Sequence, residues 1–466
     1  MKRGTQLKHL ALTAAVMVVA VATPGFAQNR IDGQSPDAPE LAGYGDLPVG
    51  VRRFDLLNPN QIDILGIDTT APRPAEYPRY DRPLTVELWY PAAQGSTGDT
   101  SFTSLIRDGR TEVTLEGRAM RDATAANAAD PFPLILMSHG YPGNRFLMSH
   151  LGENLASKGY VVASIDHTDS TYDTQAAFGS TLVNRTLDQL FVLDEMARLN
   201  ADQSSGVAGL IDTDRTGLIG YSMGGYGAIV TAGGGVSERA LAAAPFDTLA
   251  IHRQGSESHE ALVDARIRTA VAIGPWGMNA GLWDTEGLAG IDIPMLFIAG
   301  SNDRTSGYEQ GVRAIWEGAT GIDRALLTFE GGGHNTVAPI PAPAESYAAG
   351  VSGHYTDPVW DTVFMNNIGQ HFLTAWMGVE LKGDTAMSAY LDLLANGGDG
   401  VWSVDPNGLF TGDHSYWKGF REGTAGGLRY ETLIATPPAP VPLPASVWML
   451  GLAVCGIGAL RRRRQI

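Results

Sequence analysis

From residue 132 to residue 377 the sequence alternates between short apolar runs and longer segments with helical periodicity. Six apolar runs predict buried strands, and they cover residues 132–138, 160–165, 216–221, 270–275, 294–300 and 325–330. Five further segments predict helices, and they cover residues 146–158, 182–199, 224–232, 308–316 and 359–377. This alternation is typical of a mostly parallel sheet with helices on both faces, in which ligands bind beyond the carboxyl ends of the strands. The sequence therefore predicts an α/β fold.

The flanking segments set the limits of this domain. Residues 51–91 contain β-rich pieces broken by prolines, and 84–90 is the clearest strand, suited to the antiparallel start of a mixed sheet. We therefore expect one α/β domain over residues 51–430. Residues 28–50 are rich in Pro, Gly and Asp without periodicity and predict a loose leader. Residues 233–266 interrupt the alternation and predict either a cap over the site or a surface insertion.

The predicted strand 216–221 leads directly into the motif G-x-S-x-G, which runs from Gly220 to Gly224. In a tight turn from strand to helix, glycines on both sides of a serine let the backbone pass closely enough to push the hydroxyl into a cleft. A predicted helix rich in small residues follows, as such a turn requires. Ser222 is therefore the predicted nucleophile.

A serine hydroxyl needs a base within hydrogen-bonding distance, and that base needs a carboxylate to orient it. His334 follows the last predicted strand on a loop of three glycines, from which an imidazole can reach back to the serine. His354 lies in a polar loop and His371 inside the closing helix, so both are weaker candidates. We therefore expect His334 to be the base.

The predicted carboxylate is that of Asp303, which follows the strand 294–300. Asp284 and Asp292 are alternatives, but neither follows a convincing apolar strand. With Asp303 the order along the chain is Ser, Asp, His, with separations of 81 and 31 residues. This is the order found in α/β-hydrolases.

Acyl transfer also needs N–H donors for the oxyanion of the tetrahedral intermediate. The backbone of Met223, directly after the nucleophile, is one predicted donor. The second is expected from an earlier loop, and the sequence His139-Gly140-Tyr141 follows the strand 132–138. We therefore assign the second donor to the Tyr141 N–H and expect His139 to shape this loop.

Several segments between residues 84 and 382 resemble the dienelactone-hydrolase-related serine esterases, which include platelet-activating-factor acetylhydrolases and bacterial cutinase-like polyester hydrolases. The matching segments are S-H-G-Y-P-G from Ser138, L-A-S-K-G-Y-V-V-A from Leu155, G-Y-S-M-G-G from Gly220, N-D ending at Asp303 and G-G-H ending at His334. The resemblance implies an α/β-hydrolase fold and an ester rather than an amide substrate. It also places the polyester-hydrolase oxyanion donors on Tyr141 and Met223, and their substrate-stacking tryptophan on Trp276.

The chain departs from these relatives at several positions. The acetylhydrolases take their acid from the end of the strand after the nucleophile, where this chain has Gly274, so the acid is expected at Asp303. Dienelactone hydrolases use a cysteine where this chain has Ser222. The C-terminal disulfide common in the cutinase-like enzymes is impossible here, because the only cysteine is Cys455.

Together these residues predict ester hydrolysis through an acyl-enzyme. The alternatives are an acetylhydrolase-like phospholipase and a surface-displayed binding protein that retains the fold without using it. The segment Asp166-His167-Thr168-Asp169 fits no standard metal-ligand spacing and is expected to form a loop network near the active site. We predict no metal and no cofactor.

Both ends of the chain carry targeting patterns. Residues 1–27 have basic, apolar and small-residue zones and predict a secretory signal peptide, with an uncleaved membrane anchor as the alternative. Residues 431–444 are proline-rich, and 441–466 contain V-P-L-P-A, an apolar stretch and four arginines. This tail resembles the PEP-CTERM sorting signals, with Leu443 in place of the glutamate that names the class, and implies processing by an exosortase-like enzyme. The pattern predicts export to the periplasm or cell surface, with transient anchoring in the inner membrane.

The charge of the chain excludes one class of partner. Without the two targeting segments, 26 basic residues face 50 acidic ones, a net charge of −24. Nucleic acids are polyanions, so we expect no nucleic-acid partner.

Overall fold

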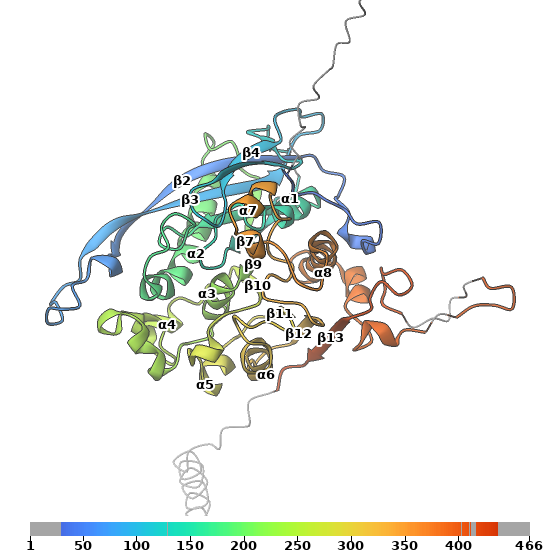
Figure 1. Ribbon diagram of the computed structural model, residues 1–466. Helices are drawn as coiled ribbons and strands as arrows, with labels where there is room; N and C mark the ends of the chain where they lie inside the picture. Colours follow the sequence, from blue (N-terminus) through green and yellow to red (C-terminus); the bar gives the residue numbers. More distant parts are fainter. Residues whose placement is uncertain (1–28, 128, 402, 410, 412–415, 437–466) are drawn as a thin grey trace, which may run out of the picture.

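The computed structural model describes residues 29–127, 129–401, 403–409, 411 and 416–436, and it contains one large sheet covered by helices (Figure 1). Its parallel strands are β7 (Phe132–Ser138), β8 (Val161–Asp166), β9 (Ile211–Tyr221), β10 (Ile267–Ile273), β11 (Met295–Gly300) and β12 (Arg324–Phe329). Its margins are β2 (Val49–Ile62), β3 (Arg79–Pro91), β6 (Met120–Arg121) and β13 (Leu428–Leu433). The strand order is β13-β12-β11-β10-β9-β7-β8-β3-β2-β6, and only β12–β13, β8–β3 and β3–β2 are antiparallel pairs. The predicted α/β architecture with a mostly parallel sheet is confirmed.

Successive side chains of the central strands enter two separate apolar cores. In β7, Leu134 and Leu136 belong to one core, whereas Ile135 and Met137 belong to the other. The first core is covered by α2 (Phe178–Ala201), α3 (Met223–Thr231), α5 (Thr285–Ala289) and α6 (Ala314–Gly318), and the second by α1 (Ser149–Ser157) and α8 (Thr362–Lys382). Because both faces of these strands are buried, their sequences read as continuous apolar runs.

The segment before β2 is packed onto the domain, so the prediction of a loose leader over 28–50 is wrong for its described part. Strand β1 (Asn29–Arg30) pairs with β5 (Glu112–Glu116), and the side chains of Ile31 and Ala42 are buried. The backbone N–H of Leu41 donates to Nδ1 of His371 in α8. The few apolar residues of this segment insert singly into the finished domain, so they leave no periodic pattern in the sequence.

The inserted segment 233–266 forms three short helices beside α2. These are η3 (Glu238–Ala243), η4 (Pro245–His252) and α4 (Glu257–Glu260). The imidazole of His252 lies 2.8 Å from the Val183 carbonyl oxygen of α2, and the backbone of Ser237 donates to the Leu282 carbonyl. These contacts attach the insertion to the helical layer of the first core.

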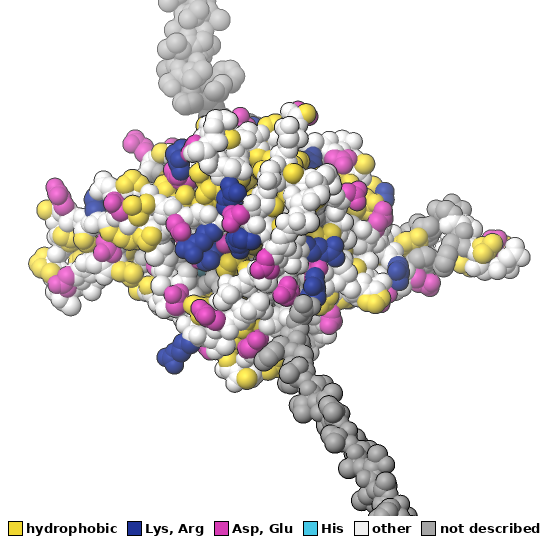
Figure 2. All heavy atoms as spheres, turned by 90° about the horizontal axis from the view of Figure 1, so that it is seen from above, with side chains coloured by type: hydrophobic (Ala, Val, Ile, Leu, Met, Phe, Trp, Pro, Cys, Tyr) yellow, Lys and Arg dark blue, Asp and Glu magenta, His cyan; other side chains and the backbone are white. Residues whose placement is uncertain are grey.

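The domain ends slightly later than predicted, because β13 pairs with β12 up to Leu433 and thus includes the first residues of the predicted linker 431–444. The predicted signal peptide and the tail 441–466 lie outside the described residues. Within the described part of the chain, no helix has the length and apolarity needed to span a membrane. Figure 2 shows one face of the molecule, on which basic and acidic side chains lie side by side rather than in a single-sign patch.

Candidate active site

Ser222 lies on a tight turn between β9 and α3, with φ 52° and ψ −110°. A positive φ is unfavourable for a serine and persists only where the surroundings enforce it. Here the Ser222 N–H donates to the carbonyl oxygen of Ile273 in β10 at 2.8 Å. A side chain at Gly220 would collide with the Gly224 carbonyl, and one at Gly224 would collide with the Ser138 carbonyl. The turn therefore needs both glycines of the motif, as the sequence predicted.

The structure brings Ser222, His334 and Asp303 together from three different strand ends. Nε2 of His334 lies 3.0 Å from Oγ of Ser222, and Nδ1 of the same ring lies 2.8 Å from Oδ2 of Asp303. The other carboxylate oxygen of Asp303 accepts from the N–H groups of Thr305 and Ser306 at 2.8 and 2.9 Å. The carboxylate is thus fixed on one side by backbone and on the other by the imidazole.

The alternative acids and bases lie elsewhere. Asp284 accepts from the Gly287 N–H and caps α5, and Asp292 follows that helix before β11. Nε2 of His354 is bonded to the Tyr172 hydroxyl at 3.0 Å, and His371 is buried within α8. Of the candidate bases and acids, His334 and Asp303 are the pair that lies at Ser222.

Gly274, at the carboxyl end of β10, is the position from which related acetylhydrolases take their acid. It has φ +49°, and a Cβ placed on it would lie 3.4 Å from both Oδ2 of Asp303 and Nδ1 of His334. The ends of β10 and β11 therefore both face the same imidazole. In this chain only the second of them carries a carboxylate.

The loop that contains Gly140 and Tyr141 lies against the serine. A Cβ on Gly140 would lie 3.3 Å from Cβ of Ser222 and 3.1 Å from the Tyr221 ring. Met223 is the first residue of α3, where backbone N–H groups have no partner within the helix. Among the described residues, neither the Tyr141 N–H nor the Met223 N–H has a protein acceptor. Two N–H groups without an acceptor thus lie beside Ser222: that of Tyr141, on the neighbouring loop, and that of Met223, the next residue in the chain.

Three aromatic side chains pack in a row beside this loop. The Trp276 and Phe178 rings meet edge to face with centroids 4.9 Å apart, and Phe178 meets Tyr141 in the same way at 4.7 Å. The backbone N–H of Trp276 donates to the Ser222 carbonyl at 3.1 Å, which connects this residue to the turn that carries Ser222. Phe178 was not expected from the sequence, because it lies just before the predicted start of its helix. It is 37% exposed and lies between the other two rings.

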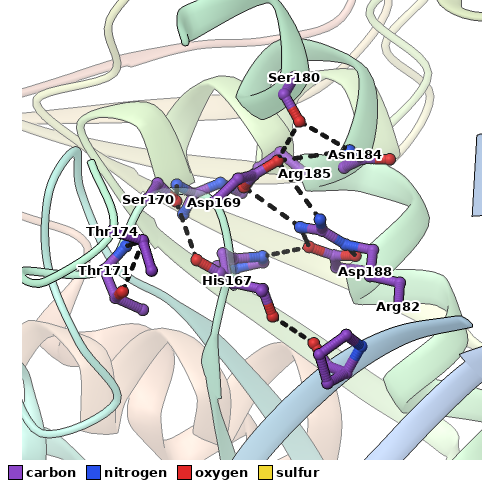
Figure 3. Close-up of polar contacts among 12 residues, drawn as sticks. Arg82, His167, Asp169, Ser170, Thr171, Thr174, Ser180, Asn184, Arg185 and Asp188 are labelled. Carbon is purple, nitrogen blue, oxygen red and sulfur yellow. Dashed lines mark hydrogen bonds and ion pairs between the residues drawn. The ribbon is translucent and has the colours of Figure 1, made fainter. Parts of the chain in front are cut away.

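A second Ser-His-Asp chain lies in the interior next to His139 of the Gly140 loop, and Figure 3 shows its contact between His167 and Asp188. Oγ of Ser138 lies 2.8 Å from Nε2 of His167, and Nδ1 of His167 lies 2.9 Å from Oδ2 of Asp188. All three residues are fully buried, so a substrate has no access to this serine. The atom pattern of a catalytic triad is present, but the position is that of a structural network.

Two arginines and a second aspartate, Asp169, complete this network. Arg82 donates to both oxygens of Asp188 at 2.7 and 2.8 Å and to Asp169 at 3.2 Å. Arg185 donates to the carbonyl oxygen of His139 and to Oγ of Ser170. Burial lowers the pKa of His167 well below its ordinary value, and the positive charges of Arg185 and Arg82 lower it further. The histidine is therefore neutral, and the charges of the network balance.

The predicted loop network at 166–169 is present, but its side chains face different partners. Asp166 pairs with Arg145 at 2.5 Å, whereas His167 and Asp169 belong to the interior network. Within the described ranges, no group of three or more His, Cys, Asp or Glu side chains converges as metal ligands. Sequence reasoning missed Arg82, Arg185 and Asp188. The sequence did carry a signal for Arg185 and Asp188, because these two charged residues lie one helical turn apart on a buried face of α2.

A family described as PETase, PET hydrolase-like, matches residues 122–257, a range that contains Tyr141, Ser222 and Met223 but not Asp303 or His334. Cutinase 2 of Thermobifida cellulosilytica is 26% identical over 201 residues, which are 43% of this chain and 59% of that protein. Bis(hydroxyethyl) terephthalate hydrolase of Streptomyces coelicolor is 31% identical over 156 residues, 33% of this chain and 44% of that protein.

Platelet-activating factor acetylhydrolase of Cavia porcellus is 31% identical over 120 residues, 24% of this chain and 27% of that protein. The solved structure of a ferulic acid esterase from Streptomyces cinnamoneus covers 77% of this chain and 94% of its own, with a TM-score of 0.49 and 20% identity. The chain thus spans about half the length, or less, of these three curated relatives. Part of the chain is thus similar in sequence to PETase and cutinase-like hydrolases.

Proposed function

We propose that this protein hydrolyses carboxylic esters through an acyl-enzyme at Ser222. In the first step His334 takes the proton of Ser222 as its oxygen attacks the ester carbonyl, and then gives that proton to the leaving alcohol. Water, deprotonated by the same imidazole, hydrolyses the acyl-enzyme in the second step. Asp303 keeps the imidazole oriented and stabilises its charged form. The N–H groups of Tyr141 and Met223 hold the oxyanion in both steps.

The observation that carries this proposal is the continuous hydrogen-bonded chain from Ser222 through His334 to Asp303, with the serine on a strained turn. Ser222 is 8% exposed and the His334 side chain is 17% exposed, whereas the Asp303 side chain is only 1% exposed. A surface-binding protein that retained the fold without catalysis has no physical need for this strain or for two unpaired N–H groups beside it.

For the substrate we propose esters with an aromatic or other flat apolar group, including polyesters. The row formed by Tyr141, Phe178 and Trp276 offers aromatic faces and edges next to Ser222, and such surfaces favour aromatic ligands. Two of the relatives are named as a cutinase and a terephthalate ester hydrolase, which supports this substrate class. The acetylhydrolase relative supports short-chain phospholipids as the second candidate.

The test is hydrolysis of p-nitrophenyl acetate through octanoate, of bis(hydroxyethyl) terephthalate and of a short-chain phospholipid by the purified protein. A fluorophosphonate probe should label the wild type, and Ser222→Ala should lose both the label and the turnover. The ranking of the three substrate types then separates polyester-like, general and phospholipid activity. A folded wild type that neither turns over these esters nor binds the probe would favour the binding-protein alternative.

We also propose that the protein acts outside the inner membrane, at the periplasmic side or the cell surface. The support is the sequence of the two ends, with a signal peptide over 1–27 and a sorting tail over 441–466 that an exosortase-like enzyme would process. Fractionation of cells that produce the full chain, with and without the four terminal arginines, tests this location.

A further inference from the structure

The tautomer of His139 follows from its two hydrogen bonds. Its Nε2 accepts from the backbone N–H of His167 at 3.2 Å, and a backbone N–H can only donate. Burial lowers the pKa of His139 well below its ordinary value, and the nearby charge of Arg185 lowers it further, so the ring is neutral. The single ring proton therefore sits on Nδ1. From there it is donated to the carbonyl oxygen of Gly140 at 2.7 Å.

That carbonyl belongs to the same peptide group as the Tyr141 N–H. In a trans peptide the C=O and N–H bonds point in opposite directions. A hydrogen bond that fixes the Gly140 oxygen toward the His139 ring thus fixes the Tyr141 N–H away from it. It also polarises the peptide, which makes the N–H a stronger donor. On its other side Gly140 adjoins Ser222.

The interior network holds the two neighbours of this peptide. The His139 carbonyl accepts from Nη1 of Arg185 at 2.5 Å, and the Tyr141 hydroxyl donates to the Ala176 carbonyl at 2.5 Å. The backbone N–H of Ala176 in turn donates to the carbonyl of Asp169. The peptide before the Gly140–Tyr141 group and the side chain after it are therefore both anchored.

The residue that holds His139 is itself immobilised. His167, whose backbone N–H fixes Nε2 of His139, has its ring held between Ser138 and Asp188, as Figure 3 shows for Asp188. Asp188 is held by the bidentate contact with Arg82. The buried Ser-His-Asp chain thus connects a rigid ion pair to the loop beside Ser222.

We infer that His139 is a positioning residue that orients the Tyr141 N–H toward the oxyanion, and that the buried Ser138–His167–Asp188 chain exists to hold it there. This inference rests on the proposed ester hydrolysis at Ser222. The interior network then has no substrate of its own. Its role is to keep one peptide group in a single orientation through the reaction.

Three substitutions of His139 separate the effect of the hydrogen-bond donor's position from the effect of the side chain's volume. In His139→Asn the amide nitrogen stands near the place of Nδ1 and can still donate to the Gly140 carbonyl, whereas in His139→Gln the amide reaches the place of Nε2 instead. His139→Leu removes both functions. With p-nitrophenyl butyrate we expect kcat to fall about 30- to 100-fold in the Leu and Gln variants, since loss of one oxyanion donor costs about 100- to 1000-fold. The Asn variant should stay within about fivefold of wild type, and KM within about twofold in all three.

The Ki of a trifluoromethyl ketone distinguishes a positioning role of His139 from a purely structural one. The ketone forms a tetrahedral adduct with Ser222 that carries an oxyanion, so its Ki should rise by the same factor by which kcat/KM falls. The matched control is His252→Leu. It also removes a fully buried imidazole bonded to one backbone carbonyl, and it should leave kcat and Ki unchanged.

Several results would overturn the inference. Among them are a folded His139→Leu variant with wild-type kcat, a Gln variant as active as the Asn variant, and a fall in kcat without a change in ketone affinity. If the Leu variant does not fold, the ratio of the Asn and Gln variants still decides the question. A wild type without Ser222-dependent turnover refutes the proposed function, and the inference falls with it. Turnover with no difference among the variants refutes the inference alone.

Discussion

Nη1 of Arg185 donates a hydrogen bond of 2.5 Å to the carbonyl oxygen of His139, and solvent reaches neither residue. The hydrogen-bond acceptors of this arginine are neutral oxygens, because Asp169 and Asp188 are bonded to Arg82 instead. Burial lowers its pKa to about 10, so it remains a cation at neutral pH. A buried cation held by neutral oxygens is costly for stability, which favours a functional reason for its place.

Arg185→Lys should lower both stability and activity. A lysine keeps the charge, but one compact ammonium cannot replace a planar fork that spans the His139 carbonyl and the Ser170 hydroxyl. We expect the free energy of unfolding in urea to fall by about 1–3 kcal/mol, as for buried groups left unpaired, and kcat to fall about tenfold. Arg198→Lys on the exposed side of the same helix is the control, and equal effects of the two substitutions would contradict the assignment.

The carboxylate can be moved from β11 to β10. Asp303→Ala should reduce kcat about 1000-fold or more, since the imidazole loses its orienting acid. Adding Gly274→Asp places a carboxylate where a Cβ lies 3.4 Å from Nδ1 of His334, and aspartate tolerates positive φ better than most residues. We expect the double variant to recover at least tenfold in kcat. Initial rates with p-nitrophenyl acetate measure this, and Gly274→Ala with Asp303→Ala, which adds the strain without the charge, should recover nothing.

Loss of the aromatic row should selectively affect esters whose acyl group is aromatic. Trp276→Ala and Phe178→Leu each remove one partner of an edge-to-face contact, and aromatic contacts contribute about 0.5–1.5 kcal/mol, which is about 2- to 10-fold in affinity. We expect KM for p-nitrophenyl benzoate to rise by this factor while KM for the acetate stays within twofold. Tyr347→Leu, which changes an exposed aromatic residue, is the control. An equal rise for both esters would show that the row supports the fold rather than the substrate.

Stability should fall in acid because buried histidines stay neutral in the folded chain. Burial, together with the nearby charge of Lys158, lowers the pKa of His371 to about 3. Its Nδ1 accepts from the Leu41 N–H, so a second proton has no place there. Between about pH 6.5 and pH 3 the unfolded chain binds a proton that the folded chain does not, so stability decreases as pH falls through this range.

Urea unfolding between pH 7 and pH 4 measures this slope. His371→Leu removes one such proton, and the dependence of the unfolding free energy on pH should become shallower by up to about 1.4 kcal/mol per pH unit. An unchanged slope in His371→Leu would show that this imidazole takes up its proton as readily in the folded chain as in the unfolded chain.

Much of the fold could be predicted because the central strands are buried on both faces. The range 132–138 agrees with β7, and the other five predicted strands overlap β8 to β12. The packed leader could not be predicted, because its residues show no period and contact distant parts of the chain: the Ile31 N–H donates to the Glu116 carbonyl, and the Ala42 carbonyl accepts from Asn154. The same holds for the interior network, in which Arg82 meets Asp169 and Asp188 only after β3 and α2 have assembled.

The candidate site could be predicted residue by residue where a local pattern marks a strand end. Ser222, Asp303 and His334 each follow an apolar run, and the structure brings these three together. The interior Ser138–His167–Asp188 network could not be predicted from the sequence. A serine, a histidine and an aspartate in the interior satisfy the same donor and acceptor pattern as the surface set, and burial distinguishes the two.

The position of Gly274 next to His334 has a consequence for the history of such sites. Because two neighbouring strand ends face one imidazole, an ancestral chain could carry a carboxylate at both ends at once. Either acid could then be lost by a single substitution without a stage that lacked activity. Lineages that differ in which strand supplies the acid therefore need not have acquired their triads separately.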